Sequence, residues 1–202
     1  MKKIILSGLI LIALLSSQNA SAINGQEFGL SHGSVTHNAV SDVAASVAVA
    51  VFTLGYVEVD NLDFSGSFNL HYTLRPLRKL GVGAVLSYER SNGDVVCQRK
   101  ICGTVKNTYL SVMPTLSFSW FDFKFVGMYS KVGLSYTFMK SKYNYFDSSA
   151  VDNDADDKAN DGELWFQFSP VAIEGGLPNL KAFAEFGFGT QGLVNLGIKY
   201  KF

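Results

Sequence analysis

Apolar and polar residues alternate with a period of two along most of the chain after residue 60. In residues 80–89, LGVGAVLSYE, the side chains of Leu80, Val82 and Leu86 share one face, while Gly81 and Ser87 lie on the other. Such alternation is typical of a strand with one apolar and one polar face. The same pattern recurs in residues 64–74, 109–120, 126–140, 164–172, 184–189 and 194–202. We therefore predict seven strands, and an eighth over the more weakly patterned residues 26–34.

The length of these strands and the composition of their faces are typical of a membrane-spanning barrel. Most patterned segments have about ten residues or more, whereas strands of soluble sheets commonly have about five or six. About ten residues cross a bilayer when the strand is tilted. The polar faces are rich in Gly, Ser, Thr and Asn, which suit a narrow barrel interior, and the large apolar residues suit lipid. The pattern predicts an all-β, eight-stranded antiparallel transmembrane β-barrel.

The connections between the predicted strands alternate in length. Short turns are expected at residues 75–79, 121–123 and 176–179, and longer loops near residues 91–103 and 141–162. A barrel with turns at one end and loops at the other produces this alternation. Residues 190–192 are an exception, because they form a tight connection on the long-loop side. We expect both termini of the mature chain at the short-turn end, which faces the periplasm.

Residues 38–52 do not follow the strand pattern clearly. The valines between Val40 and Val51 recur at helical spacing, and Asn38 or Ser41 could cap a helix in the first long loop. Val and Thr are equally suited to a strand, however, so a short helix and a strand both remain open here.

The N-terminal residues resemble a secretory signal peptide. Lys2 and Lys3 precede an apolar run over residues 4–15, and Ala20-Ser21-Ala22 forms a cleavage site. The run is shorter than the roughly 20 residues of a transmembrane helix. We therefore predict a signal peptide over residues 1–22 and a barrel domain over residues 23–202. Removing the two lysines leaves 15 of the 17 basic residues against 17 acidic ones, a net charge of −2 that argues against nucleic acid as a partner.

The overall composition narrows the fold class further. Aromatic residues are 13% of the chain and charged residues only 17%, against about 25% charged in a typical soluble domain. Glycine is abundant and proline is scarce. These proportions favour an all-β chain that faces either a large core or lipid.

Three charged residues fall on the predicted polar faces and so inside the barrel: Lys131, Glu185 and Lys199. A charge in a lumen is costly unless it has a partner or water. Glu185 and Lys199 lie on strands joined by a tight connection, so we expect them to pair across it. Lys131 then needs another acid, and Glu89 is the candidate.

Two cysteines, Cys97 and Cys102, flank the residues QRKI in a predicted external loop. Two cysteines in an exported chain favour a disulfide, and two free thiols are the alternative. No metal site is expected at this pair, since two thiolates without a nearby His or Cys do not complete a zinc shell.

The segment DNDADDKANDGE is a second candidate for metal binding. Asp152, Asp154, Asp156 and Glu163 match positions 1, 3, 5 and 12 of a calcium loop, but Asp157 occupies the position that requires glycine. A solvated acidic loop is the favoured interpretation, and we expect no cofactor.

The histidines are the candidates for a catalytic residue. His71 with Ser65 or Ser67 is the best Ser–His candidate for a lipid-modifying enzyme, but a hydrogen-bonding residue in the lumen is the favoured interpretation. The motifs GxSxG and HExxH and the P-loop are absent from the sequence. We therefore expect a protein that is not an enzyme.

The chain ends in an alternating strand, LVNLGIKYKF, with an aromatic residue at the last position. With the signal peptide and the strand pattern, this end resembles the small outer-membrane β-barrel families of Gram-negative bacteria. The segments GQEFGLSHGS, VGMYSKVG and AFAEFGFGTQGLVNLGIKYKF are similar to an outer-membrane β-barrel family common in Bacteroidota. The resemblance implies that Tyr200 and Phe202 form an assembly signal, and that the partners are the barrel-assembly machinery and outer-membrane lipids. It implies no known activity.

Eight strands leave an interior that side chains such as Tyr109, Met113 and Gln167 can fill. We therefore expect a monomeric barrel with a role in membrane integrity or in surface interaction through its loops. A narrow channel or carrier for small or hydrophobic solutes, and a lipid-modifying barrel enzyme, are the alternatives.

Deleting Phe202 should lower the amount of protein in the outer membrane, because the assembly signal is read before the barrel closes. The barrels that do assemble should keep their detergent resistance, since the ring of Phe202 is one of many at the membrane interface. Quantitative blotting of outer-membrane fractions, with heated and unheated samples on a detergent gel, measures both effects. A normal yield after deletion would contradict the assembly role of this residue.

Overall fold

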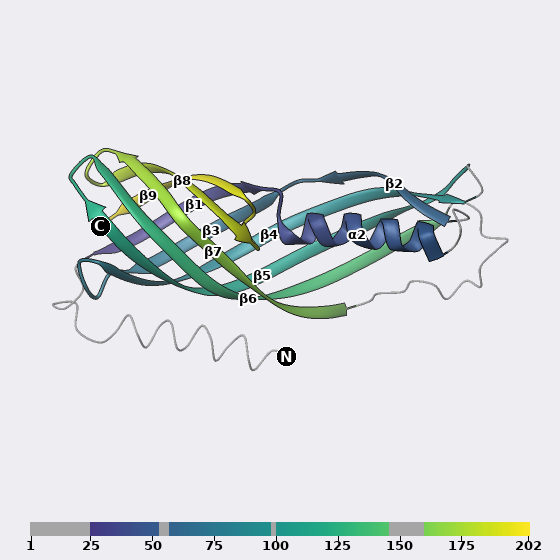
Figure 1. Cartoon of the computed structure of the whole chain (residues 1–202), viewed down its shortest axis with the longest axis horizontal. Coiled ribbons are helices and arrows are strands. Elements are labelled where there is room, and N and C mark those ends of the chain that lie inside the picture. The colour runs from purple at the N-terminus through teal and green to yellow at the C-terminus, as the bar shows by residue number, and fades with distance from the viewer. Residues whose placement is uncertain (1–24, 53–56, 98–99, 146–159) are drawn as a thin grey trace.

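A computed structural model of the chain describes residues 25–52, 57–97, 100–145 and 160–202. The predicted signal peptide, residues 1–22, lies outside the described residues and stays a prediction. The described residues contain one helix and nine strand segments, which are labelled in Figure 1. They are β1 (Gln26–Ser34), α2 (His37–Phe52), β2 (Val57–Phe64), β3 (Ser67–Leu74), β4 (Leu80–Cys97), β5 (Lys100–Asp122), β6 (Val126–Tyr145), β7 (Asn160–Gly176), β8 (Leu180–Gly189) and β9 (Val194–Lys201).

The strands form a closed antiparallel barrel, as the alternation predicts. From β3 to β9 each strand pairs with the next one in the chain, and β1 pairs with both β3 and β9, which closes the ring. β2 and β3 lie end to end along β4 and act as one strand of the barrel, so the ring has eight members. Backbone hydrogen bonds in both directions between Gln26 and Phe202 complete the seam at the short-turn end.

A bulge separates β2 from β3. Phe64 is opposite Ser91 and Phe68 is opposite Tyr88, so this strand carries one residue more than its partner between the two pairs. Gly66 takes up the extra residue with a φ of 67°, a region that glycine enters without steric cost. A Cβ at this position would lie 2.5 Å from the Gly33 carbonyl oxygen, so the bulge requires glycine.

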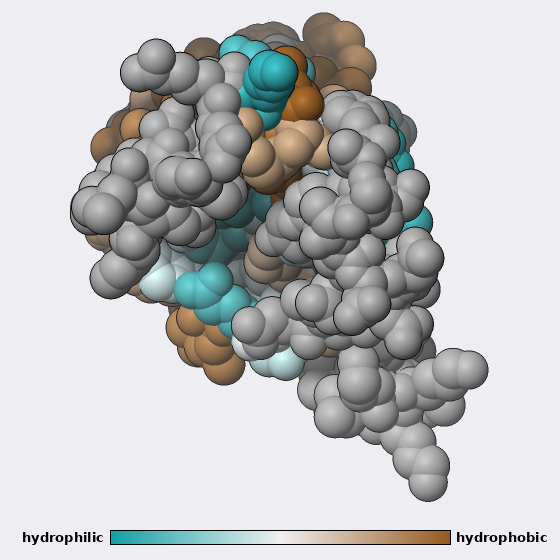
Figure 2. All heavy atoms as spheres, turned by 90° about the vertical axis from the view of Figure 1, so that its right-hand side faces the viewer, coloured by the Kyte–Doolittle hydropathy of each residue, from teal (hydrophilic) through white to brown (hydrophobic). Residues whose placement is uncertain are grey.

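The two faces of the barrel differ in composition as the sequence predicts. The outer face of the closed ring is a belt of exposed large apolar residues, which includes Phe28, Leu86, Val112, Leu134 and Phe186. Buried Ser, Thr, Asn, Gln and charged residues line the interior. A view from the α2 end shows hydrophobic residues around the outside and hydrophilic ones in the hollow between (Figure 2).

The strands are very unequal in length, which corrects one predicted loop. β4, β5 and β6 have 18, 23 and 20 residues, whereas β1, β8 and β9 have 9, 10 and 8. Residues 91–103, predicted as a loop, are mostly strand, because β4 continues to Cys97 and β5 begins at Lys100. The predicted loop at residues 141–162 begins and ends within β6 and β7, and residues 146–159 lie outside the described part.

The long strands continue past the ring as an open sheet, which we call the protruding sheet (Figure 1). It comprises β2 together with residues 90–97 of β4, 100–108 of β5, 140–145 of β6 and 160–166 of β7.

Residues 38–52, for which the sequence allows either a helix or a strand, lie in the helix α2. It begins at His37, and the backbone amide of Ala39 donates to Thr36 Oγ1 at 3.2 Å. Thr36 is therefore the N-cap, and the expected caps Asn38 and Ser41 both lie within the helix. α2 lies along the protruding sheet (Figure 1).

A second irregularity reverses the predicted orientation of one part of β7. The registers of β6 with β7 and of β7 with β8 both shift near Pro170. Val171 and Ile173 therefore point outward, and Ala172, which the alternation places outward, is fully buried inside. Proline cannot donate to the ladder, so an irregularity here is expected.

The Sγ atoms of Cys97 and Cys102 are bonded at the tip of the β4–β5 hairpin. The closed loop is short, so its chain-entropy contribution is about 2 kcal/mol and is confined to the tip. Without reduction, neither thiol should react with an alkylating reagent, and reduction should not change the heat-dependent gel shift of the barrel. Mass spectrometry of alkylated protein, with a reduced sample as control, tests this. Labelling of both thiols in unreduced protein would contradict the bond.

Candidate functional site

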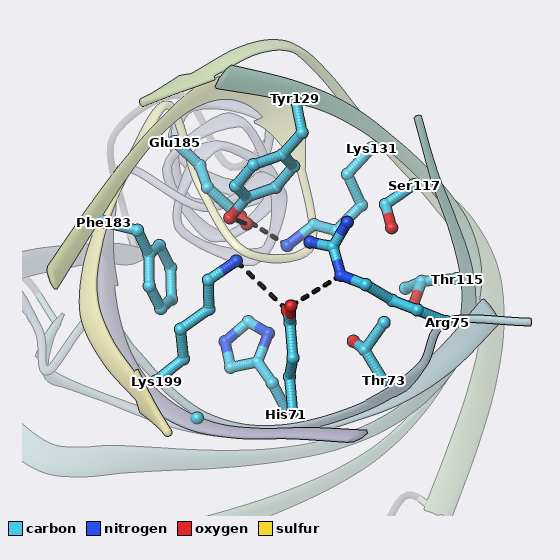
Figure 3. Close-up of a pocket in the computed structure, with 12 residues that line it drawn as sticks. His71, Thr73, Arg75, Thr115, Ser117, Tyr129, Lys131, Phe183, Glu185 and Lys199 are labelled. Atoms are coloured by element: carbon cyan, nitrogen blue, oxygen red, sulfur yellow. Dashed lines mark hydrogen bonds and ion pairs between the residues drawn. The ribbon is translucent and has the colours of Figure 1, made fainter. Parts of the chain in front are cut away.

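The interior of the barrel holds two clusters of buried charges. In the first, Lys131 and Glu185 form an ion pair, with both side chains nearly inaccessible to solvent. Tyr129 donates its hydroxyl proton to Glu185 at 2.7 Å, and the Asn195 amide donates to the same carboxylate at 3.0 Å. Figure 3 shows Tyr129 and Lys131 of β6 and Glu185 of β8 pointing toward one another inside the barrel. Glu185 is thus compensated by one cation and two neutral donors.

The second cluster lies toward the short-turn end and is a continuous chain of ion pairs. Arg75 Nε lies 2.5 Å from Glu27, and Lys199 lies 3.2 Å from the other oxygen of Glu27. Lys199 also pairs with Glu174, so it joins the two carboxylates. The chain continues through three further pairs: Lys181–Glu174, Lys181–Asp122 and Lys201–Asp122. The two clusters together hold five cations and four anions, so nearly every lumenal charge is balanced.

These pairs correct the expected partners. Lys131, Glu185 and Lys199 all lie on the interior side, but Glu185 pairs with Lys131 instead of Lys199. Asn195 occupies the position opposite Glu185 in the register, and Lys199 lies opposite Lys181, so the tight connection does not bring Glu185 and Lys199 together. Glu89 does not pair with Lys131 and instead accepts hydrogen bonds from Thr36, just before α2, and from Asn38 in its first turn.

Side chains fill most of the lumen around the charges. Met113 and Gln167 are almost completely buried, as is Tyr109. A cavity inside the barrel, lined by His71, Lys131 and their neighbours, has about 30 Å³. This volume holds about one water molecule. It is too small for a sugar, an amino acid or a nucleotide.

The first turn of α2 covers the lumen at the other end. The His37 ring stacks on Trp165 with centroids 5.0 Å apart. Burial lowers the pKa of His37 to about 4. Thr36 and Asn38 donate to the two carboxylate oxygens of Glu89 at 2.5 and 2.7 Å. A neutral histidine at physiological pH therefore covers the mouth beside a fully hydrogen-bonded carboxylate.

Asp42 attaches the next turn of α2 to the inner face of the protruding sheet. Its carboxylate accepts hydrogen bonds from Tyr109 at 2.5 Å, from Ser91 at 2.5 Å and from Asn107 at 3.2 Å. These donors come from β4 and β5, so a single side chain joins the helix to two strands. The helix is therefore a fixed part of the sheet's concave side.

The Ser–His candidate has a different partner from the expected one. His71 Nε2 lies 2.6 Å from Ser31 Oγ and 3.4 Å from the amide nitrogen of Gln191. Ser67 bonds instead to the Gln191 carbonyl, and Ser65 bonds to Gly66. His71 points into the filled lumen (Figure 3), and Ser31 is buried beside it, so a lipid cannot reach the pair. This geometry supports a hydrogen-bonding role in the interior.

No cluster of three His, Cys, Asp or Glu side chains in the described ranges is arranged to hold a metal ion. The aspartates of the calcium-like loop, residues 152–157, lie outside those ranges, so that hypothesis stays a prediction. In the same part of the chain, α2 is too short to be a membrane-spanning helix.

Several charged residues of the interior were not predicted from the sequence, notably Glu27, Arg75, Glu174 and Lys181. Glu27 and Lys181 precede outward residues in their strands, so the alternation itself could have identified both. Glu174 follows the bulge near Pro170, which changes the phase of the pattern. Arg75 lies in a predicted turn and reaches into the lumen from its edge.

Comparison with known proteins gives only distant structural similarity. No family model matches the chain, and no curated protein matches it, so the resemblance to the Bacteroidota family stays a prediction. The solved structures that are similar include Ail, the attachment invasion locus protein of Yersinia pestis, with 15% identity and a TM-score of 0.43. A structure of the same protein with the heparin analogue sucrose octasulfate has 13% identity and a TM-score of 0.43. In both, 88% of this chain aligns with 97% of the other. No functional conclusion follows from similarity this distant.

Replacing Lys131 by Met should destabilise the barrel by about 3–5 kcal/mol, because Glu185 then remains as a buried, unpaired charge. The double variant Lys131→Met/Glu185→Gln should recover most of this loss, since it leaves no isolated charge. Equilibrium unfolding by urea in detergent micelles gives both free energies. Lys124→Met, at an exposed turn position, is the matched control and should change stability by less than about 0.5 kcal/mol. Equal losses in the single and double variants would contradict the pairing.

Proposed function

We propose that the protein is an integral outer-membrane β-barrel that presents the protruding sheet outside the cell as a surface for binding other proteins. The observation that carries this proposal is the unequal length of the strands. β4, β5 and β6 continue well past the ring, whereas β1, β8 and β9 end with it. Strands that only cross a membrane do not need this extra length.

The belt of apolar residues supports a position in a membrane. On β4 the outward side chains from Leu80 to Tyr88 are mainly apolar, and Arg90 is the first charged one beyond them. On β5 the corresponding belt runs from Leu110 to Trp120. The strands of this region are paired with a neighbouring strand on each side, as hydrocarbon requires. An exposed apolar surface of this size in water would cause aggregation.

The edges of the protruding sheet supply a way to bind a partner. Within the described residues, β2 pairs only with β4, and residues 160–166 of β7 pair only with β6. Each edge therefore lacks a second neighbouring strand within the described residues. An extended peptide can add to such an edge as a further strand, with backbone hydrogen bonds supplying the affinity. The partner that fits is a protein with an exposed strand or an extended segment.

The filled lumen supports a role other than transport. Its cavity of about 30 Å³ and its ion pairs leave little room for a solute in the described part of the lumen, so a channel or carrier is the less favoured alternative. The enclosed His71–Ser31 pair likewise makes a lipid-modifying enzyme the less favoured one.

The remaining parts of the proposal concern biogenesis. We propose that the barrel is exported by its signal peptide and is monomeric. The short-turn end, where Gln26 meets Phe202, then faces the periplasm. Tyr200 and Phe202 point outward at this end, where the assembly machinery can reach them. Outer-membrane lipids surround the apolar belt.

Removing the tip of the protruding sheet should abolish partner binding but leave the barrel intact. Gly93 lies opposite Val105 in the register, so Asn-Gly in place of residues 94–104 should close the shortened hairpin. Cells that display either form are exposed to a library of labelled extended peptides, and the retained peptides are counted. We expect at least tenfold lower retention on cells with the shortened form.

The double variant Cys97→Ser/Cys102→Ser is the matched control, because it alters the same tip but keeps the sheet edges. Both variants should keep the heat-dependent gel shift, and neither should give conductance steps in a planar bilayer. Equal retention of peptides by the shortened and full-length forms would contradict the binding role. Regular conductance steps would show instead that the lumen conducts.

A further inference from the structure

The outer face of the protruding sheet carries a group of basic side chains just beyond the apolar belt. They are Arg90 on β4, Lys106 on β5, and Lys140 and Lys142 on β6, and we call them the basic strip. All four side chains are exposed. Both chain neighbours of Lys106 are buried on the inner face of the sheet. Each of the other three members also has a buried chain neighbour there. The strip therefore lies on the convex outer face of the sheet.

The register brings the members of the strip together. Lys106 lies directly opposite Lys142 on the neighbouring strand. Thr108 lies opposite both Arg90 on one side and Lys140 on the other, so its hydroxyl is between two cations. Like charges directly opposite each other destabilise an antiparallel pair. The arrangement therefore has a cost for the isolated protein, and a bound anion would remove it.

No acid neutralises the strip within the described part of the chain. The ion pairs recorded there join interior residues or residues of the short-turn end, and none includes a member of the strip. Two acids do lie on the same outer side, Asp63 and Asp94. They lie toward β2, and Asp94 accepts a hydrogen bond from Asn61.

The strip lies at the depth of lipid head groups. The last apolar residues of the belt on these strands are Tyr88, Leu110 and Phe138. Arg90 and Lys140 are two residues farther along their strands, and Lys106 and Lys142 are four residues beyond Leu110 and Phe138. Because a strand rises about 3.4 Å per residue, these cations lie within roughly 7–14 Å of the hydrocarbon boundary. A phosphate attached to a lipid reaches this zone.

We propose that the basic strip binds the phosphate groups of a phosphorylated lipid in the outer leaflet around the barrel. Lys106 and Lys142 contact one phosphate. Arg90, Lys140 and the Thr108 hydroxyl are further donors, and they lie closer to the apolar belt. This inference rests on the proposed location in the outer membrane, and it adds a specific lipid contact to it. A free anion could use the same donors, but the position of the strip beside the belt favours a molecule whose acyl chains pack on that belt.

The strip is confined to one side of the barrel. On the other side of the ring, the exposed residues at the corresponding ends are Phe188 of β8 and Val35, which directly follows β1, and both are apolar. A charged lipid is therefore held on the side that carries the protruding sheet. Such a contact fixes the base of the sheet relative to the membrane surface.

The test uses the full mature chain in nanodiscs that contain phosphatidylcholine and a small fraction of lipid A, a bis-phosphorylated saccharolipid. Native mass spectrometry counts the lipid A molecules that stay bound when the nanodisc is removed. The variant is Lys106→Gln/Lys142→Gln, and the control Lys79→Gln/Lys124→Gln removes the same charge at the exposed short-turn end. The variant Lys106→Arg/Lys142→Arg keeps the charge.

We expect the Gln pair in the strip to weaken lipid A binding by about 30-fold, since each basic residue near an anionic surface contributes about fivefold. The control and the Arg pair should bind lipid A as the unaltered protein does. Equal binding by the strip variant and the control would overturn the proposal. Displacement of lipid A by millimolar inorganic phosphate would also overturn it, because the strip would then be a site for a soluble anion.

The heat-dependent gel shift is recorded for every variant in the same samples. If the strip variant keeps the gel shift and binds lipid A as the unaltered protein does, the barrel fold is supported and only the lipid-binding role of the basic strip is refuted. If the unaltered chain shows no shift and does not enter nanodiscs, the membrane location itself is wrong, and the lipid proposal is refuted with it.

Discussion

The pairing of β1 with β9 is the constraint on which the rest of this structure depends. Once these two strands meet, every strand of the ring has two partners, and no backbone group within the ring is left at an edge. Closure also divides the side chains into two sets, because alternate residues must point outward or inward. The apolar belt and the polar lumen are therefore consequences of the same event, which joins residues near the two ends of the mature chain.

A ring of eight strands is narrow, and this explains the arrangement of charges inside it. A lumenal lysine cannot reach bulk water, so it must find a carboxylate on another strand. Lys131 finds Glu185 across the interior, and Lys199 joins Glu27 to Glu174. The first turn of α2 then covers the mouth with His37 and Asn38. Packing and charge compensation thus produce a solid core where a wider barrel would contain a pore.

The proposed binding surface lies on the part of the molecule that the ring does not need. The extra residues of β4, β5 and β6 form a sheet with open edges, a concave side occupied by α2 and a disulfide at its tip. Its convex side carries Lys106 and Lys142 immediately above the belt. A rigid barrel, a lipid contact at the base and free edges above would together hold a binding surface at a constant orientation outside the cell.

The sequence by itself determined the class of fold, the strands and the side of the wall on which most residues lie. Alternation is a local property, so it placed Lys131, Glu185 and Lys199 inside the barrel correctly. It could not determine which charges pair, because Lys131 on β6 and Glu185 on β8 are separated by β7 and do not lie on one hairpin. It also failed where a bulge changes the phase, as at Ala172, and where β4 and β5 continue through polar residues that resemble a loop. Those features depend on closure and register, which only the tertiary structure sets.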